Sequence, residues 1–202
     1  MAAFAVVGTL LALLFSIGQF ISVGVFWRQL DAGGAIPTAR DGHACEVLGN
    51  TMFVHGGRSG VKTWHKSMHI LEFDTLKWRN VVSDDKLIAS RSGHSMTRVN
   101  DRLFIFGGKT GVFTYSGEMI TFDPTTDWFK VLETRGSAPS PRQAHSAVAI
   151  GKYVYVYGGI DGNNRPSDLY VFDTDRNEWT QPKTSGIAPS EMEGHKAVVH
   201  GR

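Results

Sequence analysis

The chain lacks the features that mark a secreted or a nucleic-acid-binding protein. Cys45 is the single cysteine among 202 residues, so no intramolecular disulfide can form, and no Asn-x-Ser/Thr sequence occurs. Both absences weakly indicate a folded region that does not mature in an oxidising compartment. The 21 basic and 19 acidic residues leave a net charge of +2, too small to indicate nucleic-acid binding by bulk electrostatics. We therefore expect a cytoplasmic-facing chain with no nucleic-acid partner.

Sequence signatures of catalysis are also missing. No Gly-x-Ser-x-Gly, phosphate-loop or Cys-x-x-Cys sequence occurs. After residue 26 no convincing helical periodicity is found, whereas short runs rich in aromatic and β-branched residues recur. These observations favour an all-β chain that binds other molecules, with no cofactor, over an enzyme.

Residues 1–26 are set apart because they contain no charged side chain. As a helix they would rise about 39 Å, enough to cross a hydrocarbon core of about 30 Å. A transmembrane anchor is one interpretation. A signal peptide, with Ser22-Val23-Gly24 as the cleavage site but no basic n-region, is a second, and the edge of a truncated sequence is a third. If the segment spans a membrane, Arg28 and Arg40 just after it favour a cytoplasmic side for the remainder.

A motif recurs through residues 27–202 at an interval near 50 residues. Three histidines and three glycine pairs each keep a 51-residue step, and a fourth histidine, His195, follows 50 residues after the third. Such a period is typical of a radial or solenoid array. The recurring markers are the histidines His43, His94 and His145, the glycine pairs at 56–57, 107–108 and 158–159, the Phe-Asp pairs at 73–74, 122–123 and 172–173, and Trp27, Trp78, Trp128 and Trp179.

Each complete repeat predicts four short strands, a to d. Strand a and strand b are joined by a two-residue hairpin whose Gly or Asn supplies a positive φ. Strand b is apolar on both faces, as expected when neighbouring sheets cover it, and the glycine pair closes it where another strand approaches. The Phe and Trp markers, which end strand c and open strand d, are predicted to be core residues. Strand a is expected at 43–48, 94–99 and 145–150, with hairpins at 49–50, 100–101 and 151–152.

Paired glycines after an apolar strand, then an aromatic-Asp pair and a Trp about six residues later, resemble kelch repeats. The resemblance implies an all-β kelch β-propeller, usually of six or seven four-stranded blades. Here we expect three complete blades plus partial blades at both ends, namely strand d at Trp27 and strand a ending at Val199, preceded by the apolar N-terminal helix. The third repeat departs by Gln143-Ala144 and the fourth by Met192 in place of Arg. Because the ring is incomplete, we expect a fragment that self-associates through its open edges.

The Arg-x-Gly-His sequence before strand a resembles kelch proteins that act as adaptors, scaffolds and small-GTPase regulators. In a four-stranded blade the b–c and d–a loops share one end. The b–c loops vary in sequence, at 58–67, 109–117 and 160–167, and variable loops on a rigid scaffold are where recognition resides. The resemblance implies that arginines at this end hold an acidic or hydroxyl-rich peptide. The predicted partner-binding residues are Arg40, Arg91, Arg142, Lys62, Trp64, Lys66, Lys109, Tyr115 and Arg165.

Alternatives stay open for these residues. The arginines could instead make structural hydrogen bonds to the next blade, and Trp64 could be buried within its own loop. The histidines lie on different blades, so we expect hydrogen bonds between strands rather than a shared metal. A metal-dependent enzyme resembling galactose oxidase or the plant specifier proteins is the alternative function. For the former, Cys45 has no neighbouring Tyr or His cluster, and for the latter no Glu, Asp and His set has a comparable spacing.

Overall fold

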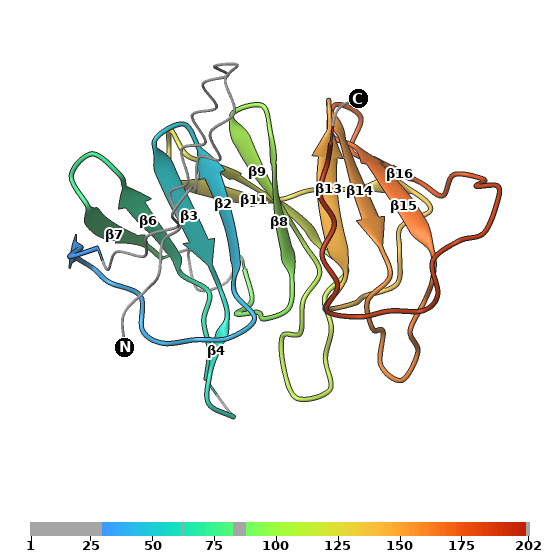
Figure 1. Ribbon diagram of the computed structural model, residues 1–202, viewed down its shortest axis with the longest axis horizontal. Helices are drawn as coiled ribbons and strands as arrows, with labels where there is room; N and C mark the ends of the chain where they lie inside the picture. Colours follow the sequence, from blue (N-terminus) through green and yellow to red (C-terminus); the bar gives the residue numbers. More distant parts are fainter. Residues whose placement is uncertain (1–29, 62, 83–87, 201–202) are drawn as a thin grey trace, which may run out of the picture.

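The computed structural model describes residues 30–61, 63–82 and 88–200, which form β-strands, turns and loops and no helix. Three sheets follow one another along the chain, and each is one blade (Figure 1). The strand orders are β1-β7-β6-β3-β2, β11-β10-β9-β8 and β12-β16-β15-β14-β13. The four predicted strands of every repeat are therefore present in sequential antiparallel order. The predicted all-β architecture is confirmed.

The four main strands of each blade have nearly the same lengths. In the first sheet they are β2 (Ala44–Leu48), β3 (Thr51–His55), β6 (Met68–Glu72) and β7 (Lys77–Val81). In the second they are β8 (Ser95–Val99), β9 (Arg102–Phe106), β10 (Met119–Asp123) and β11 (Trp128–Val131). In the third they are β13 (Ser146–Ile150), β14 (Tyr153–Tyr157), β15 (Leu169–Asp173) and β16 (Glu178–Thr180).

Two short outer strands were not predicted. β1 (Gly33–Gly34) pairs in parallel with β7, and β12 (Arg135–Gly136) pairs in parallel with β16. Gly34 and Gly136 have positive φ, and a Cβ there would lie 2.2 Å and 2.1 Å from the carbonyl oxygens of Trp78 and Trp179. Only glycine, which has no Cβ, allows the two backbones to come this close. This explains why glycine occurs at the same place in both repeats.

The turns repeat with the same geometry in all three sheets. The a–b hairpins have two residues, and Gly49, Asn100 and Gly151 open them with φ of 59°, 53° and 58°. This confirms the predicted hairpins. The c–d turns have four residues each, so the strand pairing across them is the same in each blade.

The constant c–d turn corrects two sequence markers. Leu71 pairs with Trp78 as Phe172 does with Trp179, so Leu71 holds the buried position, and Phe73, predicted to end strand c in the core, lies half-buried in the turn. In the second sheet Phe122 pairs with Phe129. Trp128 lies one position earlier, opposite Asp123, and is 64% exposed. The prediction that it is a core residue is therefore wrong, because Phe129 occupies the buried position.

The hydrophobic core lies between the sheets. Phe53 and Ile70 of the first sheet pack against residues of the second in one buried cluster, and Phe104 and Phe106 of the second pack against the third in another. Strand b is thus covered on both faces in the middle sheet, as its sequence predicts. The partners across these interfaces include Leu103, Ile105, Phe122 and Phe129, and then Val154, Val156, Phe172 and Trp179.

The predicted partial blades have different outcomes. Residues 181–200 form no strand, so the prediction of a strand a ending at Val199 is wrong, because the described residues offer it no neighbouring strand of a fourth sheet. Trp27 and the predicted apolar helix at 1–26 lie outside the described residues. No helix capable of crossing a membrane is found in the part of the chain that the structure describes.

Candidate functional site

Three long b–c loops emerge at the same end of the sheets, opposite the a–b hairpins (Figure 1). The first loop includes the short hairpin β4 (Arg58–Ser59) and β5 (Thr63–Trp64). The first glycine of each pair closes its loop by donating its N–H to the carbonyl of the residue just before strand c. These acceptors are Ser67, Glu118 and Asp168, at 3.2, 3.3 and 3.2 Å. The three residues are therefore structural equivalents.

The repeat arginines are built into the bases of these loops. In each, one guanidinium nitrogen donates to the carbonyl of the first glycine of its own blade, at 2.9–3.0 Å. Another, Nε, donates to the carbonyl two residues earlier in the chain. The arginines thus fasten the start of strand a to the end of strand b. The three donor and acceptor pairs are Arg40 with Gly56, Arg91 with Gly107 and Arg142 with Gly158.

In two repeats a carboxylate completes the arginine environment. Arg91 donates to Glu118 at 2.9 Å, and Arg142 is held by both oxygens of Asp168, one at 3.1 Å. Both arginines are 0% exposed. Burial lowers the pKa of Arg91, and the Glu118 carboxylate opposes that shift. Neither guanidinium is therefore accessible at the loop surface.

Arg40 has the same backbone bonds but no carboxylate partner among the described residues. Its position equivalent to Glu118 and Asp168 is Ser67, and its second terminal nitrogen lies 3.1 Å from Thr38 Oγ1 and 3.4 Å from His69 Nε2. Its side chain is half-buried. Burial lowers the pKa of His69, and the Arg40 charge lowers it further. This corner of the first blade is therefore an uncompensated cationic site.

The other predicted residues are placed differently. Lys109 lies 5.7 Å from the ring centroid of Tyr115, and Arg165 bonds to Glu193 at 3.1 Å. Trp64 is half-buried in the β4–β5 hairpin opposite Arg58. Lys66 is half-buried, and Lys62 lies outside the described residues. Arg40 and Trp64 thus both lie at the first b–c loop, whereas Arg165 lies apart from them on the third.

Sequence reasoning missed the exposed apolar residues at the loop tips. Val61 of the first loop is 80% exposed, and Val112 and Phe113 of the second are 56% and 90% exposed. The signal was present as Gly-Val at the same place in both loops, where the third loop has Gly162-Asn163.

The histidines link neighbouring sheets, as predicted. His145 Nε2 lies 2.9 Å from Ser95 Oγ. His195 Nε2 lies 2.8 Å from Ser146 Oγ. In the first sheet Ala44 takes the place of the serine, and His94 instead bonds to His55 at 3.1 Å. Each ring therefore docks onto the preceding blade.

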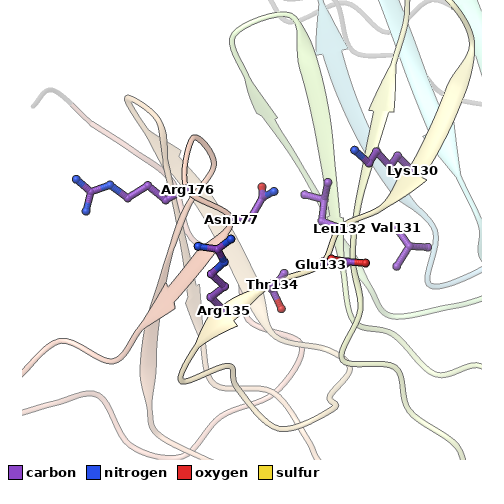
Figure 2. A pocket seen from close by; sticks show the side chains of 8 residues that line it. All are labelled: Lys130, Val131, Leu132, Glu133, Thr134, Arg135, Arg176 and Asn177. Atoms are coloured by element: carbon purple, nitrogen blue, oxygen red, sulfur yellow. The ribbon is translucent and has the colours of Figure 1, made fainter.

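Two hollows lie away from the loop tips. One of about 550 Å³ opens between the outer edges of the second and third sheets (Figure 2). Lys130 and Leu132 line it from the second sheet, and Arg135, Arg176 and Asn177 from the third. The other, of about 180 Å³, runs along the a strands. Across the described ranges, no three His, Cys, Asp or Glu side chains gather as a metal site would require.

Comparison with known proteins gives one consistent group. The family described as the KLHDC2/KLHL20/DRC7 Kelch-repeats domain matches residues 22–202. The human Rab9 effector protein with kelch motifs is 31% identical over 192 residues, covering 87% of this chain and 50% of the relative. Host cell factor of Drosophila melanogaster is 29% identical over 199 residues, covering 83% and 13%.

A plant relative is also similar over most of this chain but over a minor part of its own length. Acyl-CoA-binding domain-containing protein 4 of Arabidopsis thaliana is 28% identical over 192 residues, covering 89% of this chain and 28% of the relative. The chain thus spans half or less of the length of these relatives. The glycine pairs, the sheets and the family match agree, and the chain belongs to the kelch-repeat proteins.

Proposed function

We propose that this chain is a non-catalytic protein-interaction module, an adaptor or regulator that holds an acidic segment of a protein partner at Arg40. One observation carries the proposal. Arg40 alone of the three repeat arginines has no carboxylate among the described residues, whereas Glu118 and Asp168 occupy the equivalent place in the next two blades.

The physical argument rests on charge. A guanidinium forms its strongest hydrogen bonds with carboxylates, in a planar and often bidentate geometry. Within the described residues, Arg40 donates only to neutral oxygens and to an imidazole nitrogen. A carboxylate from a partner would take the position that Glu118 holds beside Arg91. The ion pairs of Arg91 and Arg142 then show the geometry expected between Arg40 and the partner's carboxylate. Arg91 and Arg142 do not themselves contact the partner in this proposal.

The relatives support binding over catalysis. One of them is named as an effector of Rab9, and this name describes action through another protein. A metal-dependent enzyme, the alternative from sequence, gains no supporting observation from the described residues. Binding of a protein partner is therefore the one function proposed for this chain.

The experiment uses a phage-displayed library of random linear peptides selected on the full chain. A synthetic peptide of the selected consensus is then titrated by calorimetry against the wild type, Arg40→Ala and Ser67→Glu. Ser67→Glu places a carboxylate where Glu118 stands, so it should neutralise Arg40 from within. Both variants should weaken binding by about tenfold or more.

Arg98→Ala is the matched control. Arg98 is an exposed arginine beside the a–b hairpin, at the opposite end of the second sheet. Its removal should leave the affinity unchanged. Peptides without acidic residues, or equal affinity of the wild type and Ser67→Glu, would overturn the proposal.

A further inference from the structure

The tips of the first two b–c loops carry apolar side chains that the fold does not use. Phe113 is 90% exposed and Val61 is 80% exposed, and neither belongs to a core cluster. The second loop is closed beneath Phe113 by a backbone bond from Thr110 to Thr114 at 2.9 Å. These side chains are therefore not needed to hold the loops in shape.

The two tips stand on a shared, hydrogen-bonded base. Gly57 of the first loop donates to the carbonyl of Arg91 at 2.9 Å, and Ser92 pairs with Lys109 at the start of the second loop. Both loops project from the same end of the sheets (Figure 1). A partner segment that binds at one of these loops would therefore lie next to the other.

Arg40 lies at the base of the same first loop. Its neighbour Asp41 pairs with Arg58 through two backbone bonds of 2.9 and 2.8 Å, and Arg58 begins the hairpin that leads to Val61. A cationic site thus lies below an apolar tip on one loop. In the third loop Asn163 and Asn164 replace the apolar pair, so apolar tips are confined to the first two loops, and the first loop alone joins such a tip to an arginine without a carboxylate partner among the described residues.

We infer that Val61, Val112 and Phe113 form a hydrophobic contact surface for the same partner, which presents apolar side chains next to the carboxylate that Arg40 receives. This inference rests on the proposed function and names what would distinguish one acidic segment from another, namely its apolar side chains. Exposed aromatic side chains that become buried on binding supply much of the affinity of protein interfaces. Phe113 is the anchor, because it is the largest and most exposed of the three.

The arrangement of the loops favours a protein segment over a lipid bilayer. All three b–c loops project from the same end of the sheets (Figure 1). A flat bilayer that met the two apolar tips would therefore also meet the polar third loop, whereas a narrow peptide segment contacts only the first two. Asp41 and Glu118 at the loop bases are paired with Arg58 and Arg91, so neither carboxylate neutralises Arg40.

The test uses the consensus peptide selected on the full chain. Phe113→Ser should weaken its binding about tenfold to a hundredfold, since the burial of one Phe side chain is lost. Trp128→Ser is the matched control, because Trp128 is also an exposed aromatic residue but lies next to a c–d turn at the opposite end. It should bind as the wild type does. Serine at the apolar positions of the peptide should abolish the difference between wild type and Phe113→Ser.

Three results would overturn the inference. The first is an unchanged affinity for Phe113→Ser while Arg40→Ala and Ser67→Glu still weaken binding, which leaves the proposed function standing. The second is failure to select any peptide that depends on Arg40, which overturns the proposed function as well. The third is Phe113-dependent sedimentation with phosphatidylcholine–phosphatidylserine vesicles in place of peptide binding, which would assign the tips to a membrane.

Discussion

Acid should unfold this protein in a pH range set by its buried histidines. His55, His94 and His145 lie between the sheets and are at most 7% exposed. Burial, followed by the charge of a neighbouring arginine, lowers the pKa of His55 and of His145 from 6.5 to about 3. Burial and then His55 lower the pKa of His94 well below 6.5. All three rings are therefore neutral in the folded protein at pH 7.

The sign and size of the effect follow from proton linkage. The three histidines take up protons in the unfolded chain as the pH falls through 6.5. In the folded chain the pKa of His55 and of His145 is about 3, and that of His94 also lies well below 6.5. The stability that depends on them is therefore fully present above about pH 6.5 and is lost as the pH falls below it. Between pH 7.5 and 5.5 each histidine should lower the free energy of unfolding by about 1.4 kcal/mol, or roughly 4 kcal/mol for the three.

Urea unfolding followed by tryptophan fluorescence, repeated at several pH values, measures this loss. His145→Gln should reduce the loss between pH 7.5 and 5.5 by about 1.4 kcal/mol, whatever its stability at pH 7.5, because one titrating group is removed. Ser185→Ala, at an exposed residue of the C-terminal segment without a titrating side chain, should leave the pH dependence as it is in the wild type. A stability that stays constant between pH 7.5 and 5.5, or a slope that His145→Gln does not change, would refute the reasoning.

Three further substitutions test the packing of the repeats by their effect on urea stability. Gly107→Ala should cost about 2–4 kcal/mol, because Gly107 has a φ of 69° and a Cβ would lie 2.6 Å from the carbonyl oxygen of Arg142; a cost below measurement would refute that close approach. Ala144→Gly should stabilise by about 0.5–1 kcal/mol, since Ala144 holds a φ of 55°, and destabilisation would count against strain there. Glu118→Gln should cost about 1–2 kcal/mol by removing the charged partner of the buried Arg91, less than for a fully buried pair because the Glu118 side chain is 46% exposed, and an unchanged midpoint would show that the ion pair contributes nothing.

Local repetition made much of the fold predictable. The glycine pairs and histidines recur in phase because each first glycine packs against a histidine ring and a backbone carbonyl of the following repeat, as Gly56 does with His94 and the carbonyl of Arg91. The four main strands of the three complete repeats lie within one or two residues of their predicted positions, whereas β1 and β12 were not predicted and the strand expected to end at Val199 is absent from the described residues. Trp128 was misplaced because sequence spacing does not show that all c–d turns have four residues. The neighbouring Phe129 was equally able to fill the core position.

The candidate site was less predictable, because its character depends on contacts between distant residues. Arg40 and Arg91 look alike in sequence, and the residues 27 positions later, Ser67 and Glu118, are separated by the same 51-residue step. The sequence does not show that this position faces the arginine of its own repeat, which the bond between Arg91 and Glu118 reveals. Exposure of Phe113 likewise depends on how its loop projects from the sheets, which its sequence does not specify.

The titration of a selected acidic peptide against Ser67→Glu tests the central claim most directly. This substitution leaves Arg40 in place and adds the one group that the first blade lacks relative to the second and third. The account predicts a folded protein whose affinity for the peptide falls about tenfold or more. A folded Ser67→Glu protein that binds the peptide as tightly as the wild type would contradict it.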